Sequence, residues 1–401
     1  MAVAGTTLST LTHLLKTRYI DRVKWAFKRK HVTLAHMRRQ TRDMSGNTFT
    51  HPVMTAETQG IGAGAETADL PTPGYTSGIN PSWSPRPHRG RIRVYEQSRH
   101  ATKDNKGSFL RAWATEVDSL VRRFMKDINI EIHGDGRGGL AYLPAADDDT
   151  TVTVAGHQGP AAGHCVRKGM ILDLIDATDD ATALSSANTI TARTSNTVTC
   201  TLIAGSAAND YWVRSGSLGY AFDGLRSIVD TSDPALANFG GLDRDAAAND
   251  DWKGQVKDFD DSFSLDLMDI AFDKVLDNTD YVPNFGVTRR NIQRLIARTL
   301  FEQMRFRPGD KTDAKPWKAV WFGEVPIYAD VHCWKDHLYF LSLPTFEFMQ
   351  VDDPHWMSFD GAIPHRVTDK AAYEASYLWH AIFASHMPNA NVRCYDVKDP
   401  T

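Results

Sequence analysis

Residues 107–139 constrain the fold most, because they have the pattern of one long amphipathic helix that ends at a run of glycines. The Ser108 hydroxyl can cap its start by accepting a hydrogen bond from a free amide of the first turn. A helix of about 22 residues is roughly 33 Å long, which is long enough to act as a strut. Its apolar face recurs at three- and four-residue steps and consists of Leu110, Trp113, Val117, Leu120, Phe124 and Ile128. Because glycine adopts backbone angles that other residues resist, the helix is predicted to stop at Gly134, Gly136, Gly138 and Gly139.

The composition is that of an ordinary globular protein. The chain has 401 residues, 42% hydrophobic and 23% charged, which allows two or three domains. Its net charge of -4 is too small to imply a polyanionic partner for the whole chain. Apolar runs stay short of the roughly 18 residues of a membrane span and no secretion signal is recognisable, so we expect no membrane contact. Four cysteines without paired spacing predict free thiols, although Cys165 and Cys200 could face each other.

Residues 1–45 are rich in basic side chains, with apolar residues between them at partly helical spacing. One interpretation is an arm that touches nucleic acid or an acidic protein surface. The other is the solvated face of a helix, and the sequence does not choose between them. The first interpretation depends most on Lys28, Arg29, Lys30, Arg38, Arg39 and Arg42.

Residues 46–106 alternate prolines with glycines and contain few large apolar side chains. Strand-like residues border the segment at 47–54 and 90–98, so we expect a long two-stranded excursion. Such a segment buries too little apolar surface of its own to offset the entropy cost of ordering it. We therefore expect it either to be disordered or to lie on another chain.

Residues 150–216 predict a small all-β module that follows an acidic linker at 145–149. Five runs rich in Thr, Val and Ile are separated by turn residues, and they favour a small barrel or a curled sheet. From residue 219 the pattern is mixed. It predicts helices at 264–276 and 288–304, the second capped by Thr288, and strands at 317–322, 325–329 and 338–341. The tail at 373–397 is predicted to hold a short apolar helix and a last strand.

Patterns that suggest chemistry each have a simpler structural interpretation. Gly134, Gly136 and Gly139 match G-x-G-x-x-G, but a helix precedes them where a dinucleotide site needs a strand. Acidic runs at 147–149, 250–251 and 258–261 lack the spacing of a calcium loop. Asp266, Asp269 and Asp273 are expected on the solvent-exposed face of one helix. The candidate metal ligands lack the paired spacing of zinc sites; they are His133, His157, His164, Cys165, His332, Cys333 and His337. Since no catalytic motif occurs, we expect no cofactor, no metal and no enzymatic activity.

The order of these parts resembles the major capsid proteins of tailed bacteriophages with the HK97 fold. That family has an N-terminal arm, an extended loop called the E-loop, a long spine helix, a peripheral domain and an axial domain. Residues 107–143 resemble the spine helix with its glycine stop. Residues 322–343 (FGEVPIYADVHCWKDHLYFLSL) resemble the family's run of glycine, turn, strand, aspartate and strand. Residues 345–359, with the turn Asp353-Pro354-His355-Trp356, and Pro388-Asn389-Ala390 are also similar.

The resemblance implies an α+β fold of HK97-like type to which a small all-β module is added. It divides the chain into an N-terminal arm at 1–45, an E-loop at 46–106, and a spine helix with the start of the peripheral domain at 107–149. The inserted module occupies 150–216, the axial domain 217–335, and the return to the peripheral domain with a C-terminal strand 336–401.

The resemblance also implies a function. Copies of the chain are expected to form hexamers and pentamers that close an icosahedral shell around a double-stranded DNA phage genome, in the virion capsid, after assembly in the host cytoplasm. Further expected partners are scaffolding, portal and decoration proteins, and packaged DNA through non-specific phosphate contacts. The E-loop would lie across a neighbouring subunit, and the side chains expected to contact that neighbour are Tyr75, Ile79, Trp83, Ile92, Val94 and Tyr95.

Two other functions stay open at this point. A carbohydrate-active or other soluble enzyme could be built on the β module, and it would show a deep pocket with converging carboxylates in a compact monomer. An encapsulin-like cellular compartment would share the shell fold and hold cargo instead of a genome. The long basic arm and the inserted module favour the phage shell over both.

Overall fold

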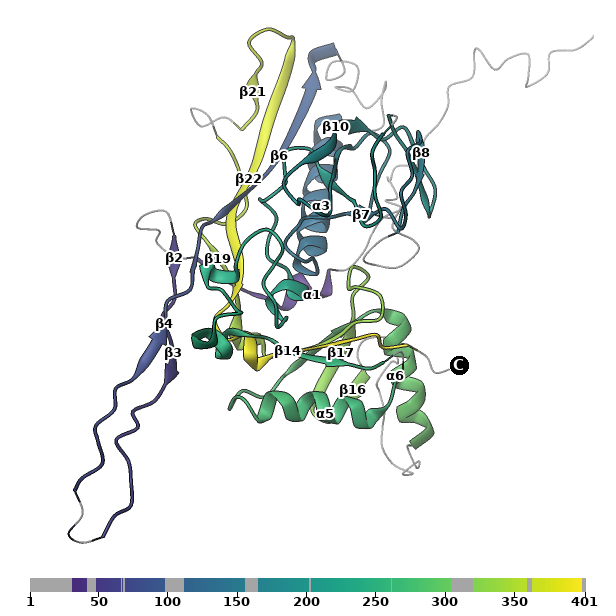
Figure 1. Cartoon of the computed structure of the whole chain (residues 1–401). Coiled ribbons are helices and arrows are strands. Elements are labelled where there is room, and N and C mark those ends of the chain that lie inside the picture. Colours follow the sequence, from purple (N-terminus) through teal and green to yellow (C-terminus); the bar gives the residue numbers. More distant parts are fainter. Residues whose placement is uncertain are drawn as a thin grey trace, which may run out of the picture. The chain divides into compact units, whose positions relative to one another are not determined.

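The computed structural model describes residues 31–41, 48–65, 67, 69–97, 112–155, 165–201, 203–260, 262–303, 320–358 and 363–398. They belong to two compact units. Figure 1 labels the helices and strands of both. The smaller unit holds residues 91–97, 112–122, 357–358 and 363–376, and the larger unit holds the others. Several residues of the predicted arm and helix start lie outside the described residues, namely Lys28, Arg29, Lys30, Arg42, Ser108 and Leu110.

The smaller unit combines segments that are distant in the sequence. They are the end of β6 (Arg86–Tyr95), the start of α3 (Ala112–Ile132), and β21 (His365–Arg366) with the start of β22 (Ala372–Ser385). β21 runs antiparallel to β22, and β6 also pairs with β22. Within this unit the Arg93 guanidinium donates a hydrogen bond to the Glu374 carboxylate, so an ion pair reinforces the strand pairing.

The long helix expected from the sequence is α3. It includes the backbone of Trp113, Leu120 is half-buried, and Phe124 is buried. The helix ends at Ile132, and the Gly134 amide donates to the Glu131 carbonyl at 2.9 Å. Gly138 then adopts a φ of +74°, where a Cβ would lie 2.8 Å from the Ala221 Cβ. Both the backbone angle and the close approach therefore require glycine at this turn.

The β module begins earlier than residue 150 and consists of two small sheets, not one barrel or curled sheet. β7 (Ala141–Tyr142) completes a four-stranded sheet with β9 (Ile171–Ile175), β10 (Ala183–Thr189) and β13 (Tyr211–Arg214). A three-stranded sheet contains β8 (Thr151–Thr153), β11 (Ala192–Arg193) and β12 (Thr197–Thr199). Their side chains share one core, which includes Cys165 and Cys200. All four cysteines of the chain are buried and free.

The core of the larger unit's second half is a six-stranded sheet covered by two helices. In spatial order its strands are β14 (Gln255–Asp258), β23 (Val392–Tyr395), β18 (Leu338–Leu341), β15 (Phe285–Thr288), β17 (Val325–Ala329) and β16 (Val320–Phe322). Helices α5 (Leu265–Leu276) and α6 (Arg290–Gln303) pack their apolar faces into the core of this sheet. Strands from both sides of residue 335 belong to it, so the predicted boundary between 335 and 336 does not separate two sheets.

A side-chain hydroxyl caps the start of α5, whereas the cap predicted for α6 does not form. The Ser264 hydroxyl accepts a hydrogen bond from the Leu267 amide at 3.1 Å, which caps α5. Thr288, predicted to cap α6, is instead the last residue of β15. Its hydroxyl donates to the His337 carbonyl at 2.7 Å, so the sheet and not the helix uses it.

The apolar helix predicted in the tail is also wrong, because these residues form the 14-residue strand β22. In the larger unit β22 is antiparallel to β19 (Phe346–Gln350) and to β20 (His355–Trp356). β1 (Arg38–Thr41) runs parallel to β19 on the other side. Neighbouring strands on both edges supply the hydrogen bonds that decide the conformation of this largely apolar run.

Candidate functional site

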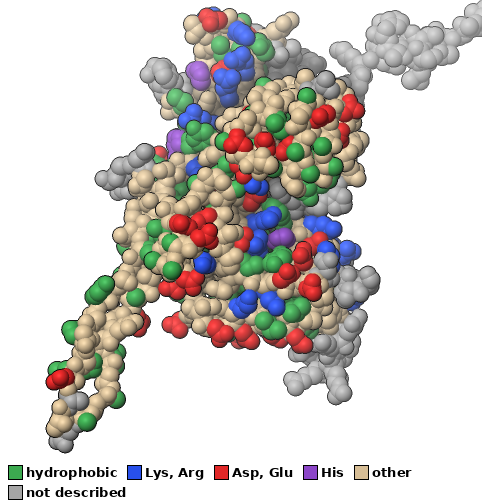
Figure 2. Space-filling model, in the orientation of Figure 1, with side chains coloured by type: hydrophobic (Ala, Val, Ile, Leu, Met, Phe, Trp, Pro, Cys, Tyr) green, Lys and Arg blue, Asp and Glu red, His purple; other side chains and the backbone are tan. Residues whose placement is uncertain are grey.

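The described part of residues 48–83 forms a long hairpin whose strands pair near its base, and one further hydrogen bond joins the legs, from the Thr58 hydroxyl to the Gly74 carbonyl at 3.1 Å. β2 (Phe49–Thr50) pairs with β5 (Ser82–Trp83), and β3 (Val53–Ala56) pairs with β4 (Ser77–Ile79). Beyond β3 and β4 the two described legs carry apolar side chains in open solvent: Ile61 is 87%, Leu70 92% and Tyr75 84% exposed. Figure 2 shows hydrophobic side chains along this segment with no other part of the larger unit over them. Large exposed apolar side chains grouped on one segment are typical of a protein interaction surface.

The base of the hairpin is held by an aromatic cluster of the same chain. Trp83 is only 4% exposed. Its ring packs edge-on against Phe239 at a centroid distance of 5.7 Å and lies tilted against Trp252 at 6.1 Å. The Trp252 indole donates to the Phe239 carbonyl at 2.9 Å, which fixes the cluster. The hairpin therefore leaves the folded body from a rigid base.

These observations correct half of the predicted interface residues. Trp83, Ile92 and Val94 are buried within their own chain, so their side chains are not available to a neighbour. The prediction overlooked that the base of the excursion has a local core. Tyr75 is exposed, Ile79 is half-buried, and Tyr95 is 49% exposed, so these three stay predicted contacts.

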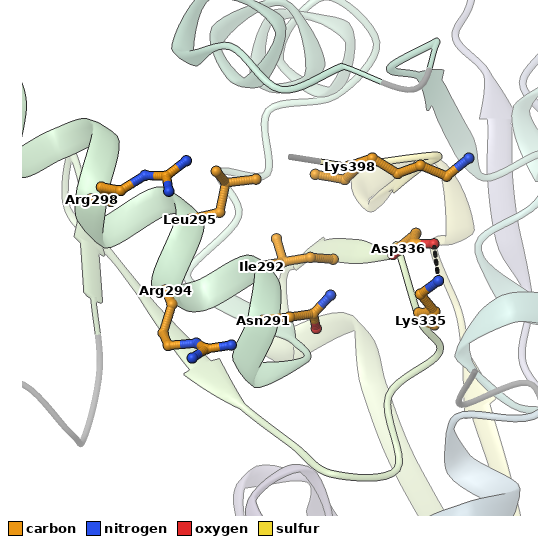
Figure 3. Close-up of a pocket in the computed structure, with 9 residues that line it drawn as sticks. Asn291, Ile292, Arg294, Leu295, Arg298, Lys335, Asp336 and Lys398 are labelled. Atoms are coloured by element: carbon orange, nitrogen blue, oxygen red, sulfur yellow. Dashed lines mark ion pairs between the residues drawn. The ribbon is translucent and has the colours of Figure 1, made fainter. Parts of the chain in front are cut away.

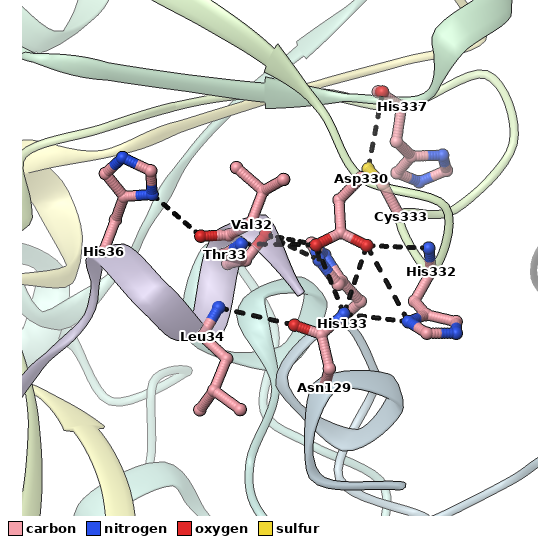
Figure 4. Close-up of polar contacts among 10 residues, drawn as sticks. All are labelled: Val32, Thr33, Leu34, His36, Asn129, His133, Asp330, His332, Cys333 and His337. Carbon is pink, nitrogen blue, oxygen red and sulfur yellow. Dashed lines mark hydrogen bonds and ion pairs between the residues drawn. The ribbon is translucent and has the colours of Figure 1, made fainter. Parts of the chain in front are cut away.

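A second feature is a buried polar group that we call the Asp330 cluster, formed by Thr33, Asn129, His133, Asp330 and His332 (Figure 4). The Thr33 amide and hydroxyl both donate to the Asp330 carboxylate, at 3.2 and 3.0 Å. The Asn129 amide group donates to the same carboxylate at 3.1 Å, and the His332 amide donates at 2.9 Å. One carboxylate thus joins α1 (Val32–His36), the end of α3 and the loop after β17.

The electrostatics of the Asp330 cluster favour an ionised Asp330 carboxylate beside a neutral His332 imidazole. Burial alone would raise the pKa of Asp330, but the hydrogen bond and charge of His133, together with His332, hold this pKa well below its usual range. Burial lowers the pKa of His332 to about 3, despite the attraction of Asp330. A fully hydrogen-bonded ionised group of this kind fastens segments together.

The candidate metal ligands of the sequence do not form a metal site among the described residues. Within them no group of three or more His, Cys, Asp or Glu side chains is placed to hold a metal ion. Cys333 is buried and burial raises its thiol pKa, so it is a poor nucleophile or ligand. His157 and His164 lie outside the described residues, and Cys165 belongs to the core of the β module. None of the described helices combines the length and the apolarity that a membrane crossing needs.

Of the basic residues predicted in the arm, Arg38 and Arg39 lie in β1. The Arg39 guanidinium lies 5.7 Å from the centroid of the Trp379 ring, and the residue is exposed. The sequence pattern singled out His133 and His332 only as candidate metal ligands and did not predict the Asp330 cluster. Hydrogen bonds between its three segments join residues that are 100 to 297 positions apart, and no local pattern links these segments.

The sequence and the structure were each compared with known proteins. Scans of protein-family models and of curated proteins found no match to the sequence. Among solved structures, the cyanophage A-1(L) capsid asymmetric unit is similar with a TM-score of 0.59 at 12% identity, covering 96% of this chain and 98% of that chain. The capsid of a native GTA particle has a TM-score of 0.53 at 8% identity, and the capsid of Myoviridae phage XM1 has 0.51 at 9%, each covering 98% of this chain and 99% of the other. The chain therefore has the fold of phage capsid proteins, the HK97-like fold that the order of its parts predicted.

Proposed function

We propose that this chain is a major capsid protein that assembles into hexamers and pentamers and closes an icosahedral shell around a double-stranded DNA phage genome. The observation that carries the proposal is the distal hairpin, because Ile61, Leu70 and Tyr75 are almost fully exposed on a chain with the phage capsid fold. Removing such side chains from water favours association. A neighbouring copy is the surface that would cover them.

Each contact of this kind is weak by itself, but a subunit in a shell makes many of them. Their free energies add once the copies are held together, because each further contact is then intramolecular. In this arrangement Tyr75 and Ile79 contact the neighbouring copy, and the basic arm at 1–45 contacts DNA phosphates or an acidic surface of another subunit. The protein acts structurally, in the virion capsid, and assembles in the host cytoplasm with separate scaffolding, portal and decoration proteins.

The test is the size and content of the particles that the purified full chain forms. Analytical sedimentation and negative-stain electron microscopy should show closed shells with fivefold and sixfold rings. Chains that remain compact monomers under all assembly conditions would contradict the proposal. Shells that form but enclose proteins and no DNA, when isolated from their native source, would indicate an encapsulin-like compartment instead.

A further inference from the structure

Polar groups near the start of the segment 31–41 attach it to the rest of the larger unit, in addition to the pairing of β1 with β19. The Thr33 amide and hydroxyl and the Leu34 amide all point into the Asp330 cluster (Figure 4). Thr33 donates to the Asp330 carboxylate, and the Leu34 amide donates to the side-chain oxygen of Asn129 at 3.3 Å. Both acceptors are buried. The attachment of the segment therefore depends on how these two buried groups are oriented and charged.

The orientation of the Asn129 amide is fixed by its partners on both sides. Its oxygen can only accept hydrogen bonds, and its NH2 group can only donate them. The oxygen faces the Leu34 amide, so the NH2 group faces the Asp330 carboxylate at 3.1 Å and the Nδ1 atom of His332 at 2.8 Å. The Nδ1 atom must then accept this hydrogen bond. The His332 ring is therefore neutral, with its proton on Nε2.

A proton on Nδ1 of His332 would break this arrangement. It would face the NH2 group of Asn129, so that two donors oppose each other without an acceptor. The Asp330 Oδ1 atom lies 3.8 Å from Nδ1, which is too far for a hydrogen bond. Half a turn of the Asn129 amide would bring its oxygen to the protonated ring, but its NH2 group would then face the Leu34 amide. Protonation of His332 and binding of the Leu34 amide thus exclude each other.

The charged and titratable groups that face His332 come from both sides of this contact. Asp330 attracts a proton on His332. The groups that oppose the proton are Lys126 on α3, His133 just after α3, and His31 at the start of the segment. The His31 and His332 rings are stacked with their centroids 5.8 Å apart. Burial is the largest influence and lowers the pKa of His332 to about 3, so the ring gains a proton near neutral pH only when the segment moves away and water reaches it.

The loop after β17 is held to the six-stranded sheet independently of the segment. The Thr288 hydroxyl donates to the His337 carbonyl at 2.7 Å, and the Val397 amide donates to the Asp336 carbonyl at 3.0 Å. In the same loop the Lys335 ammonium lies 3.5 Å from the Asp336 carboxylate (Figure 3). None of these contacts involves the segment. This side of the contact can therefore stay in place when the segment moves.

The other attachments of the segment are those of a short element at the edge of a sheet. Among the described strands β1 pairs only with β19, over four residues. Leu34 and Met37 are buried, and the exposed His36 ring lies 4.9 Å from the Tyr328 ring. Segments of this kind open locally at a lower free energy than central strands. Loss of the polar contacts can therefore release the segment before the whole unit unfolds.

We propose that the Asp330 cluster is an acid-sensitive latch. Protonation of His332 turns the Asn129 amide, frees the Leu34 amide and releases residues 31–41, while the rest of the larger unit stays folded. Because residues 1–30 precede the segment in the chain, its release also moves the point at which they join it. This inference goes beyond the proposed function, since it concerns a single folded chain and does not require assembly.

Hydrogen exchange of the unassembled full chain measures the opening of the latch. The protection of amides in peptides that cover 31–41 is compared at about pH 7.5 and about pH 5.5, after correction for the pH dependence of exchange itself. The His332 pKa is about 6.5 in the open state and about 3 in the closed state, so the open state gains the proton as the pH falls. We therefore expect the open population to rise about tenfold between these two pH values. Strand β15, inside the six-stranded sheet, is the internal reference and should keep its protection.

Three variants of the full chain identify the group responsible. His332→Gln offers Asn129 a neutral acceptor that cannot be protonated, so the rise should disappear. His36→Gln is the matched control, because His36 is the exposed histidine of the same segment, and it should keep the rise. Thr33→Val removes the hydroxyl that donates to Asp330. It should raise the open population at both pH values and leave their ratio at about ten.

Three results would overturn the inference. Protection of 31–41 that is equal at both pH values would show that acid does not open the latch, and a rise that survives His332→Gln would assign it to another group. An equal loss of protection in β15 would show that acid unfolds the whole unit. If His332→Gln does not fold, Thr33→Val decides, because an unchanged open population would show that the cluster does not hold the segment. Failure of the capsid proposal leaves this test intact, since it is made on single chains.

Discussion

The base and the distal part of the hairpin contain similar residues, yet they differ completely in what covers them. At the base Trp83 is packed among Phe239 and Trp252 and is almost inaccessible. In the distal part Tyr75 is almost fully exposed. Residue type does not explain the difference, because both are large aromatic side chains. The explanation is the packing partner: the described residues supply a core under the base and none under the distal part. Folding stability therefore depends on the base, and in the proposed shell assembly depends on the distal part.

Trp83→Ala should have the largest effect on the isolated chain. It removes a buried indole from the aromatic cluster and leaves a cavity, which costs about 3–5 kcal/mol of unfolding free energy for changes of this type. Urea unfolding followed by tryptophan fluorescence measures the loss. Trp321→Ala is the matched control, since Trp321 is exposed on β16, and it should change the unfolding free energy by less than about 0.5 kcal/mol. Equal losses for both variants would contradict the distinction between covered and uncovered aromatics.

The segment at 31–41 is a third case, because buried polar groups of the Asp330 cluster attach it to the rest of the chain. The pKa of His332 is lowered to about 3 in the folded chain, by burial first of all. A lowered pKa means that the unfolded chain takes up the proton first, so the contribution is complete above about pH 6.5 and is lost as the pH falls toward 3. Unfolding free energy should then fall by up to about 1.4 kcal/mol per pH unit between pH 6.5 and 4.5. His332→Gln should flatten this slope.

The pKa of His88 is shifted in the opposite direction from that of His332. Burial lowers the pKa of His88, but the charge and hydrogen bond of Glu131, with its carboxylate at 2.7 Å, outweigh burial and raise it overall. Its contribution is therefore complete below about pH 6.5 and is lost as the pH rises through the folded pKa. His88→Gln should flatten the alkaline side of the stability profile and leave the slope below pH 6.5 unchanged. A slope below pH 6.5 that survives His332→Gln would show that other groups cause the acid sensitivity.

Gly240→Ala tests how tightly the base of the hairpin is packed, with a smaller expected loss of about 1–3 kcal/mol. Gly240 has a φ of +66°, and a Cβ there would lie 2.8 Å from the Pro81 Cβ and 3.3 Å from the Trp83 ring. Its neighbour is a matched control: Gly241 has a φ of +72°, but a Cβ there would meet nothing closer than 3.8 Å. Both variants bear the strain of a positive φ. The difference between them in urea unfolding therefore measures the packing against Pro81 and Trp83, and equal losses would argue against a tight base.

The sequence predicted the features that depend on neighbouring residues and failed for those that depend on distant ones. Local signals were sufficient for α5, where Ser264 caps a periodic run, and for β17 and β18, whose bounds match the predicted 325–329 and 338–341. They failed for β22, whose apolar run fits helix and strand alike until β19 and β20 pair with it. They also failed for Trp83 and for Asp330, because the partners of these residues come from distant parts of the chain. The order of parts nevertheless identified the fold, since that order is set by topology and not by single contacts.

The distal hairpin should give the smallest effect on the isolated chain and a large one on assembly. Ile61→Ser, Leu70→Ser and Tyr75→Ser together remove apolar side chains that no described part of the chain covers, so each should change the unfolding free energy by less than about 0.5 kcal/mol. Particle yield should fall sharply, because serine offers a neighbouring copy little apolar surface to bury. Sedimentation measures the yield, and urea unfolding of unassembled chain measures stability.

Tyr220→Ser is the control for this triple variant, since Tyr220 is an exposed aromatic outside the hairpin, and it should assemble normally. Two outcomes would contradict the expected contrast between the base and the distal part of the hairpin. If the triple variant lost several kcal/mol of stability, the distal hairpin would be covered by its own chain in solution, and the contrast with Trp83 would vanish. If it kept both stability and particle yield, the exposed apolar side chains would not be what joins the copies, and assembly would depend on other surfaces of the chain.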